Sequence, residues 1–417
     1  MDKFIINGGK ELKGEVKISG AKNAILPIMC ATLLTTGKSV LSNVPDLYDI
    51  RMMSHLLRII GAKVVHENGI LEIDTTNCNY FEAPYEIVSK MRASFNVFGP
   101  MLAKFREAKV SFPGGCAIGA RPVDIHLKAL EMLGAKIEIL HGFVKASCDK
   151  LVGNDIVFEK VSVGATENAI SAAVLAEGET NLINTAAEPE VTALIDFLRV
   201  AGATINDDDP THLKITGVSE LKPVSLKMIP DRIEAGTFLL AGAITGSKIT
   251  VTDCIPEHLT SLIETMELCE CKFEIEDDRI TVIPPKKVKP VDIVTEPYPE
   301  FPTDLQAQFM ALMSIADGSC TITETIFPDR FMQVAELNRL GAMIDHTKNQ
   351  ATIPGVTVLS GAKVMATDLR ASAALVLAGM AAEGITEISR IYHIDRGYER
   401  IETKLQKLGA DIKRLKG

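Results

Sequence analysis

The stretch LEMLGAKIEI at residues 130–139 has a form that returns along the whole chain. It reads as the end of an amphipathic helix, a Gly-Ala pair that stops the helix, and a short strand. Four further copies and one degenerate copy occur: LRIIGAKVV (57–65), LRVAGATI (198–205), MELCECKFEI (266–275), LNRLGAMID (337–345) and LQKLGADIK (405–413). The glycines, with Glu270 in the degenerate copy, are 73, 68, 68, 71 and 68 residues apart. This period predicts six copies of one structural unit.

A second marker has the same period. An apolar helix, a turn residue and a strand occur in every copy, with the turn residue at Gly37, Glu107, Gly178, Gly246, Gly318 and Gly384. Each unit is therefore expected to contain a helix, a strand, a second helix and two short strands. Because the period exceeds that of common solenoid repeats, we expect small α/β elements and not turns of a superhelix.

Several first helices are apolar on every face, as in AISAAVLAEG (169–178), TFLLAGAITG (237–246) and ASAALVLAGMAAEG (371–384). This pattern is typical of fully buried helices, so the strands are expected to cover them. Three units would then close into each of two lobes. We expect one lobe at residues 21–229 and the other at residues 1–20 with 230–417. The crossover is placed in LKPVSLKMIP (221–230), and a cleft is expected between the lobes.

Composition excludes several classes of function. A net charge of -10 over 417 residues argues against a general binder of nucleic acid or anionic membranes. No apolar run reaches the ~18 residues of a membrane span, and the first residues do not resemble a secretory signal, so we expect a cytoplasmic protein. The eight cysteines include no CxxC pair, and the eight histidines show no HxH or HExxH spacing. We therefore expect no metal and no cofactor.

The repeat also predicts where ligands bind. The first helices should begin at Lys22, Arg92, Val163-Gly164, Asp231-Arg232, Thr303-Asp304 and Leu369-Arg370. Helix N-termini present unpaired N–H groups, so cations gathered there would create sites for phosphate or carboxylate. For each cation a salt-bridged surface residue is the alternative. Helix capping is the simpler interpretation of Asp304, and also of Ser162.

Several motifs together resemble one known family, the enolpyruvyl transferases, over the full length. These motifs are GAKNA (20–24), FPGGCAIGARPVDIH (112–126), KVSVGATEN (160–168), EFPTDLQAQ (300–308), TDLRA (367–371) and IDRGYER (394–400). The resemblance implies a two-lobed inside-out α/β barrel with three βαβαββ units in each lobe. The loop through Cys116 is similar to that of the branch that uses UDP-N-acetylglucosamine, with Ile125 where leucine is common. The branch that acts on shikimate 3-phosphate lacks this cysteine.

The resemblance implies that the enolpyruvyl group of phosphoenolpyruvate is transferred to the 3'-hydroxyl of UDP-N-acetylglucosamine, the first committed step of peptidoglycan precursor synthesis. It makes Cys116 the general acid at C3, able to carry a covalent phosphoenolpyruvate adduct, and Asp304 the base. Lys22 and Arg396 complete the catalytic set. The implied phosphoenolpyruvate site is Lys22, Asn23, Arg121, Arg396, Arg370 and Asp368. The implied UDP-N-acetylglucosamine site is Arg92, Arg121, Pro122, Val123, Asp124, Ile125, Lys160, Ser162, Val163, Gly164, Asp304 and Ile326.

Two alternatives stay open. One is enolpyruvyl transfer to shikimate 3-phosphate, and the other is a binding protein that kept the fold without turnover. The intact set of Lys22, Cys116, Asp304 and Arg396 argues against the second. The expected partners are the two small-molecule substrates, and the expected state is a monomer. We further expect the glycine-rich loop of Cys116 to act as a lid over a cationic pocket that both lobes share.

Overall fold

The computed structural model describes residues 2–112 and 123–417. These residues form two compact units. The terminal unit comprises residues 2–19 and Pro230–Gly417, and the central unit comprises residues 20–112 and 123–229. Each unit has a hydrophobic core of its own, so each can be described by itself.

Six repeats of one topology make up the described residues, three in each unit. Every repeat runs strand, helix, strand, helix, strand, strand. Its first and second strands are parallel, and its fourth strand lies between the second and third, antiparallel to both. The predicted βαβαββ unit is therefore confirmed.

The central unit holds the first three repeats. Repeat one consists of β14 (Ser225–Lys227), α1 (Lys22–Ala31) with η1 (Thr32–Leu34), β3 (Lys38–Ser42), α2 (Tyr48–Ile60), β4 (Lys63–Glu67) and β5 (Ile70–Asp74). Repeat two consists of β6 (Glu82–Ala83), α3 (Tyr85–Val88), η2 (Arg92–Val97), α4 (Phe98–Phe105), β7 (Glu107–Ser111), α5 (Asp124–Met132), β8 (Lys136–Leu140) and β9 (Phe143–Ser147). Repeat three consists of β10 (Asp155–Val157), α6 (Val163–Ala173), β11 (Glu179–Ile183), α7 (Pro189–Ala201), β12 (Thr204–Asp209) and β13 (His212–Thr216).

The terminal unit holds the other three repeats. Repeat four consists of β2 (Gly14–Lys17), α8 (Arg232–Ile244), β15 (Ile249–Thr252), η3 (Pro256–Leu259), α9 (Thr260–Leu268), β16 (Lys272–Glu276) and β17 (Arg279–Ile283). Repeat five consists of β18 (Ile293–Thr295), η4 (Thr303–Leu305), α10 (Gln306–Met313), β19 (Cys320–Glu324), α11 (Gln333–Arg339), β20 (Asp345–Thr347) and β21 (Gln350–Ile353). Repeat six consists of β22 (Lys363–Met365), α12 (Leu369–Ala381), β23 (Ile385–Ser389), η5 (Ile391–Arg396), α13 (Ile401–Lys407), β24 (Asp411–Leu415) and β1 (Lys3–Asn7).

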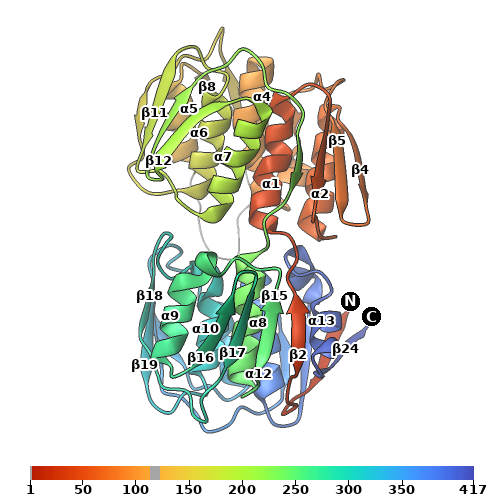
Figure 1. Cartoon of the computed structure of the whole chain (residues 1–417), viewed down its shortest axis with the longest axis vertical. Coiled ribbons are helices and arrows are strands. Elements are labelled where there is room, and N and C mark those ends of the chain that lie inside the picture. Colours follow the sequence, from red (N-terminus) through yellow and green to blue (C-terminus); the bar gives the residue numbers. More distant parts are fainter. Residues whose placement is uncertain (1, 113–122) are drawn as a thin grey trace. The chain divides into compact units, whose positions relative to one another are not determined.

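Three strands complete repeats that are distant in the sequence. The N-terminal strand β2 is the first strand of repeat four, parallel to β15, and Figure 1 shows it in red beside that green strand. Strand β14, which follows repeat three, is the first strand of repeat one and pairs with β3. Strand β1 lies between β23 and β24, with Phe4 opposite Ile388 and Arg414. The N-terminal segment therefore closes the terminal unit.

The first helices are buried, as predicted. Every residue of α8 from Ile233 to Ile244 is buried, and α12 is buried from Arg370 to Met380. Small side chains permit this packing, because a Cβ on Gly236 would lie 2.7 Å from Leu305 Cδ1. The strands of each unit lie outside these helices (Figure 1). Among the described residues, no helix is long and apolar enough to cross a membrane.

The two repeat markers are residues with left-handed backbones. The glycines of the first marker follow the second helix of each repeat directly or within a short turn, and all of them have a positive φ. Glu270, which replaces glycine in the degenerate copy, has φ 71°. The second marker needs one correction. In repeat two the left-handed residue is Arg106, with φ 62°, and not Glu107, which begins β7. A non-glycine residue at such a φ carries a steric cost, which explains why most copies keep glycine.

Candidate functional site

The first helices begin where the repeat predicts. Helices α1, η2, α6, α8, η4 and α12 start at Lys22, Arg92, Val163, Arg232, Thr303 and Leu369. The predicted site residues of the central unit gather at its helix starts, and those of the terminal unit lie near its own. Cys116, Arg121 and Pro122 lie outside the described residues.

Lys22 is a buried cation at the start of α1. Its Nζ lies 3.5 Å from Oδ2 of Asp49 in the first turn of α2, and only 11% of the Lys22 side chain and 3% of the Asp49 side chain are exposed. A surface salt bridge would leave both groups in water, so that interpretation is wrong for Lys22. Asn23 follows on the same helix and is half-buried. The Asp49 carboxylate therefore helps to fix the ammonium group at the start of α1.

A second polar group joins the starts of η2, α5 and α6. Burial, and then the charge of Arg92, lower the pKa of His126 to about 3, so its imidazole is neutral near pH 7. The Asn168 amide is oriented by Gly99, whose N–H donates to Oδ1 over 2.7 Å. Asn168 Nδ2 therefore faces His126 Nδ1 at 3.0 Å, which assigns the imidazole proton to Nε2. A Cβ on Gly164 would lie 3.0 Å from His126 Cε1, so this approach favours glycine.

The other described residues of the central unit that were predicted to bind the nucleotide lie at or near the starts of α5 and α6. Val123 precedes α5 and is buried, Asp124 begins α5, and Ile125 packs against the core. The Ser162 hydroxyl accepts the N–H of Ala165 over 3.4 Å, so Ser162 caps α6. The N–H groups that begin α6 belong to the next two residues, Val163 and Gly164. Lys160, two residues before the cap, is exposed.

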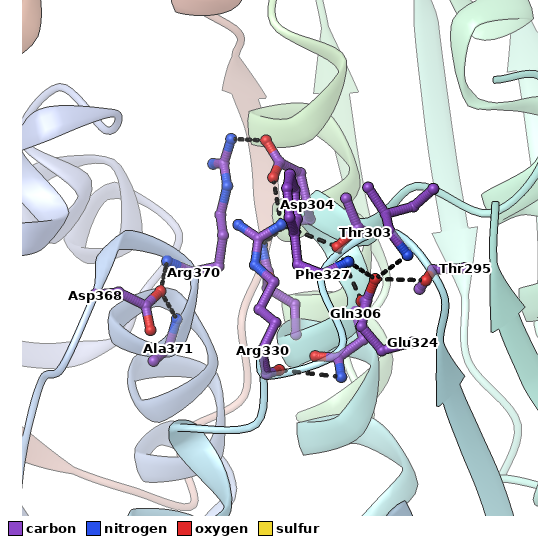
Figure 2. A network of polar contacts seen from close by, with 12 residues as sticks. Thr295, Thr303, Asp304, Gln306, Glu324, Phe327, Arg330, Asp368, Arg370 and Ala371 are labelled. Carbon is purple, nitrogen blue, oxygen red and sulfur yellow. Dashed lines mark hydrogen bonds and ion pairs between the residues drawn. The ribbon is translucent and has the colours of Figure 1, made fainter. Parts of the chain in front are cut away.

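Asp304 lies between two buried arginines in the terminal unit (Figure 2). Its Oδ1 is 2.8 Å from Arg330 Nη1, and its Oδ2 is 2.5 Å from Arg370 Nη2. Pro302 precedes η4 and no side chain caps that helix, so the capping interpretation of Asp304 is wrong. Burial lowers the pKa of Arg370, but the Asp304 carboxylate and Tyr398 outweigh burial and raise that pKa above its usual value. The same attraction favours the ionised carboxylate.

A network of buried hydroxyl groups contacts the Arg370 guanidinium group and holds it in place. Thr237 donates its hydroxyl proton to the carbonyl of Ile233 over 2.7 Å, so Tyr398, 2.8 Å away, must donate to Thr237. The Tyr398 oxygen then accepts from Gln308 Nε2 at 3.2 Å and from Arg370 Nη1 at 3.5 Å. All of these groups are buried, so the position of the guanidinium is fixed by the contacts among α8, α10, α12 and the segment after η5.

Glu324 organises the backbone around Asp304 (Figure 2). Its carboxylate is fully buried at the end of β19. Oε1 accepts the Thr295 hydroxyl at 2.8 Å and the N–H groups of Ile326 and Phe327 at 2.9 Å each. Oε2 accepts the Thr303 hydroxyl at 2.9 Å. One carboxylate thus joins strand β18, the turn that contains Ile326, and helix η4.

Asp368 and Arg396 complete the terminal unit's part of the predicted site. Asp368 caps α12, with its Oδ1 accepting the N–H groups of Arg370 at 2.8 Å and Ala371 at 3.0 Å. Arg396 ends η5 and is half-buried. Burial, and then the charge of Arg396, lower the pKa of His393, whereas Asp368 acts in the opposite direction. The charges of Arg396 and Asp368, both predicted to bind the ligand, therefore act on the imidazole of His393.

Sequence reasoning did not assign a role to five of these residues. His126 and Tyr398 lie inside motifs that indicated the family, but each is buried and acts through a neighbour. Glu324 and Arg330 belong to TETIFPDRF (323–331), where charges that follow a strand were the available signal. Asp49 gave no signal, because an acidic residue in the first turn of a helix is ordinary. Within residues 2–112 and 123–417, no cluster of three histidine, cysteine or acidic side chains could hold a metal ion.

Known proteins resemble the chain over its full length. A family model described as EPSP synthase (3-phosphoshikimate 1-carboxyvinyltransferase) matches residues 6–405. The UDP-N-acetylglucosamine 1-carboxyvinyltransferase of Desulfosudis oleivorans is 51% identical over 415 residues, covering 100% of both chains. The protein of that name from Pelodictyon phaeoclathratiforme is 52% identical over 419 residues, covering 100% of this chain and 99% of that protein.

Solved structures share the fold. The enolpyruvyl transferase NikO from Streptomyces tendae has a TM-score of 0.90 at 24% identity, covering 100% of this chain and 99% of that chain. An EPSP synthase from Acinetobacter baumannii has a TM-score of 0.77 at 17% identity, covering 100% of both chains. The predicted two-lobed enolpyruvyl transferase fold is therefore confirmed.

Proposed function

Because the chain belongs to the EPSP synthase family of carboxyvinyltransferases, we propose that it transfers the enolpyruvyl group of phosphoenolpyruvate to the 3'-hydroxyl of UDP-N-acetylglucosamine and releases phosphate. One observation carries the choice of acceptor: over its full length the chain is 51% identical to a protein named for that reaction. Shikimate 3-phosphate is the second candidate, favoured by the description of the family model and by a structure at 17% identity.

The reaction proceeds by addition and elimination. The acceptor hydroxyl loses a proton and bonds to C2 of phosphoenolpyruvate, while C3 gains a proton to give a tetrahedral ketal. The bond from C2 to the phosphate oxygen then breaks, phosphate leaves, and C3 loses a proton to restore the double bond. The protein must supply a base, an acid, and cations for the phosphate and carboxylate groups.

Asp304 is the proposed base for the acceptor hydroxyl. Its carboxylate is held ionised by two guanidinium groups and remains 24% exposed, so it is able to meet a ligand. A carboxylate paired in this way is a weak base. It therefore accepts the proton while the new bond to C2 forms, when the hydroxyl has become acidic. Cys116 is the proposed acid at C3 on the strength of the family resemblance.

Two of the cations proposed to bind the phosphate and carboxylate groups, Lys22 and Arg370, are held in fixed positions by the fold. Lys22 is anchored by Asp49 and Arg370 by Asp304, so neither side chain must be ordered when a ligand binds. Arg396 and Arg121 are assigned to the same ligand, with Asn23 as a hydrogen-bonding group. The diphosphate of the nucleotide is assigned to the N–H groups that begin α6, where the helix dipole favours negative charge.

Phosphate release from phosphoenolpyruvate tests this proposal. The purified protein is assayed with UDP-N-acetylglucosamine and, separately, with shikimate 3-phosphate, and the product is identified by mass. We expect release with the nucleotide sugar alone. Release with shikimate 3-phosphate alone would establish the second candidate, and tight nucleotide binding without release would indicate a binding protein. A role in peptidoglycan synthesis, a cytoplasmic location and a monomeric state stay predictions.

A further inference from the structure

We propose that Glu324 is a positioning residue that holds the proposed base, Asp304, and the proposed nucleotide contact, Ile326, through one buried carboxylate. This inference rests on the function proposed above and adds to it a residue that does not touch the substrate.

The Glu324 carboxylate accepts hydrogen bonds from four donors. This carboxyl group is fully buried, and a polar group in that environment is stable only when hydrogen bonds replace its water. Four donors at 2.8 to 2.9 Å do so, two of them hydroxyl groups and two of them backbone N–H groups. Both oxygens are engaged, and a carboxylate accepts at about four lone-pair positions. The side chain therefore has one fixed orientation.

Hydrogen bonds connect Glu324 to Asp304 through Thr303 and Arg330. The Thr303 hydroxyl has one proton, which it donates to Glu324 Oε2 over 2.9 Å. Its oxygen then accepts Arg330 Nη1 at 3.0 Å, and the same nitrogen lies 2.8 Å from Asp304 Oδ1. Figure 2 shows these groups in one continuous chain. Glu324 thus fixes Arg330, and Arg330 fixes one oxygen of the proposed base.

The other carboxylate oxygen of Glu324, Oε1, binds the turn that contains Ile326, the proposed nucleotide contact. The N–H groups of Ile326 and Phe327 both point at this oxygen, which sets the turn after β19. The Phe327 ring lies 5.5 Å from the Arg330 guanidinium carbon, so the turn and the arginine also pack together. Glu324 therefore controls two features of the site through two different oxygens.

The two oxygens make the proposal testable with an isosteric substitution. In Glu324→Gln, the single amide oxygen can still accept from Thr295, Ile326 and Phe327. The amide nitrogen then faces the Thr303 hydroxyl, whose donated proton loses its acceptor. We expect kcat to fall between about 10-fold and about 100-fold, the range for a misplaced catalytic group, while the KM for UDP-N-acetylglucosamine stays within about twofold.

A double-mutant cycle assigns that loss to the path through Thr303. Thr303→Val should lower kcat to the same degree, and Glu324→Gln with Thr303→Val should lower it no further, because both changes break one path. Thr303→Ser keeps the hydroxyl and should restore the wild-type rate. Glu336→Gln is the matched control, since its carboxylate is also largely buried in the terminal unit but binds the Met365 N–H, and it should leave kcat unchanged.

The outcomes separate this inference from the proposed function. If the wild-type protein turns over and Glu324→Gln changes neither kcat nor KM, the positioning role is refuted and the proposed function stands. A wild-type protein without turnover refutes the function itself. Additive losses in the cycle, or a fall in kcat that matches a general loss of folded protein by thermal unfolding, would also overturn the positioning role.

Discussion

The substitution Asp304→Asn tests the arrangement at the centre of the terminal unit. An amide has nearly the same shape, but it loses the negative charge and turns an NH2 group toward one of two buried guanidinium groups. Arg330 and Arg370 are 7% and 5% exposed, so water cannot fully replace the lost partner. Breaking a buried pair costs about 3–5 kcal/mol. Because Asp304 is 24% exposed and the amide keeps one acceptor, we expect a smaller loss of unfolding free energy, about 1–3 kcal/mol.

The effect on turnover should be much larger. Loss of a positioned general base lowers a rate by about 100-fold to about 10,000-fold. Phosphate release under saturating substrates should therefore nearly vanish, while calorimetry should give an unchanged affinity for UDP-N-acetylglucosamine. Asp207→Asn is a matched control. Asp207 also pairs with an arginine, Arg199, and its side chain is 25% exposed, but the pair joins β12 to α7, and neither element contains a predicted site residue. Its substitution should leave turnover intact.

One result would refute this reasoning. If Asp304→Asn weakened nucleotide affinity and turnover by the same factor, Asp304 would be a structural partner of the two arginines and not the base. Near-normal turnover in this variant would require another base altogether.

Three further substitutions test the buried residues Tyr398 and His126 and the proposed acid Cys116. Tyr398→Phe should lower the free energy of unfolding in urea by about 1–3 kcal/mol, because it leaves buried hydrogen-bonding groups without a partner. Tyr392→Phe should not, because Tyr392 is 49% exposed. The pKa of His126 is about 3 in the folded chain and 6.5 in the unfolded chain. The contribution of the neutral imidazole to the free energy of unfolding is therefore complete above pH 6.5. It is lost as the pH falls toward 3, by at most about 1.4 kcal/mol per pH unit. Urea unfolding of His126→Gln should show a flatter dependence between pH 7 and pH 5, and equal slopes would contradict the assigned burial. Cys116→Ala should abolish both turnover and alkylation by an epoxide phosphonate of the fosfomycin type, and an active variant would remove Cys116 from the mechanism.

Local patterns in the sequence predicted the elements of the fold well. The Gly-Ala phrases located the helix ends because a left-handed backbone there favours glycine, and the all-apolar helices indicated burial. The start of each first helix was predicted to within one residue. The expected lobe bounds already placed residues 1–20 with repeats four to six, but the repeat that β2 and β14 each join was not predictable from these patterns, because a strand's partners depend on where the chain leads it and not on its own residues. The second marker was placed at Glu107 and not at Arg106 because a left-handed backbone is unusual for a residue with a side chain, so the sequence does not indicate it at an arginine.

The sequence predicts the candidate site as a list of residues but does not predict the contacts among them. The family resemblance indicated Lys22 and Asp304, yet the sequence favoured a helix cap for Asp304 and gave no partner for Lys22. Their partners, Asp49, Arg330 and Arg370, are charges that only the folded chain brings within 4 Å. A buried ion pair joins residues far apart in sequence, so no local spacing encodes it.

The helix starts also suggest how a repeated unit acquires a site. Repeats three, four and six begin their first helices with a side-chain cap from Ser162, Asp231 and Asp368. In repeats one, two and five the preceding residues are Ala21, Met91 and Pro302, which have no side-chain acceptor. A missing cap costs about 0.5–2 kcal/mol at each helix. Those three helices carry Lys22, Arg92 and Asp304, so in each of them a predicted site residue lies at a helix start that no side chain caps.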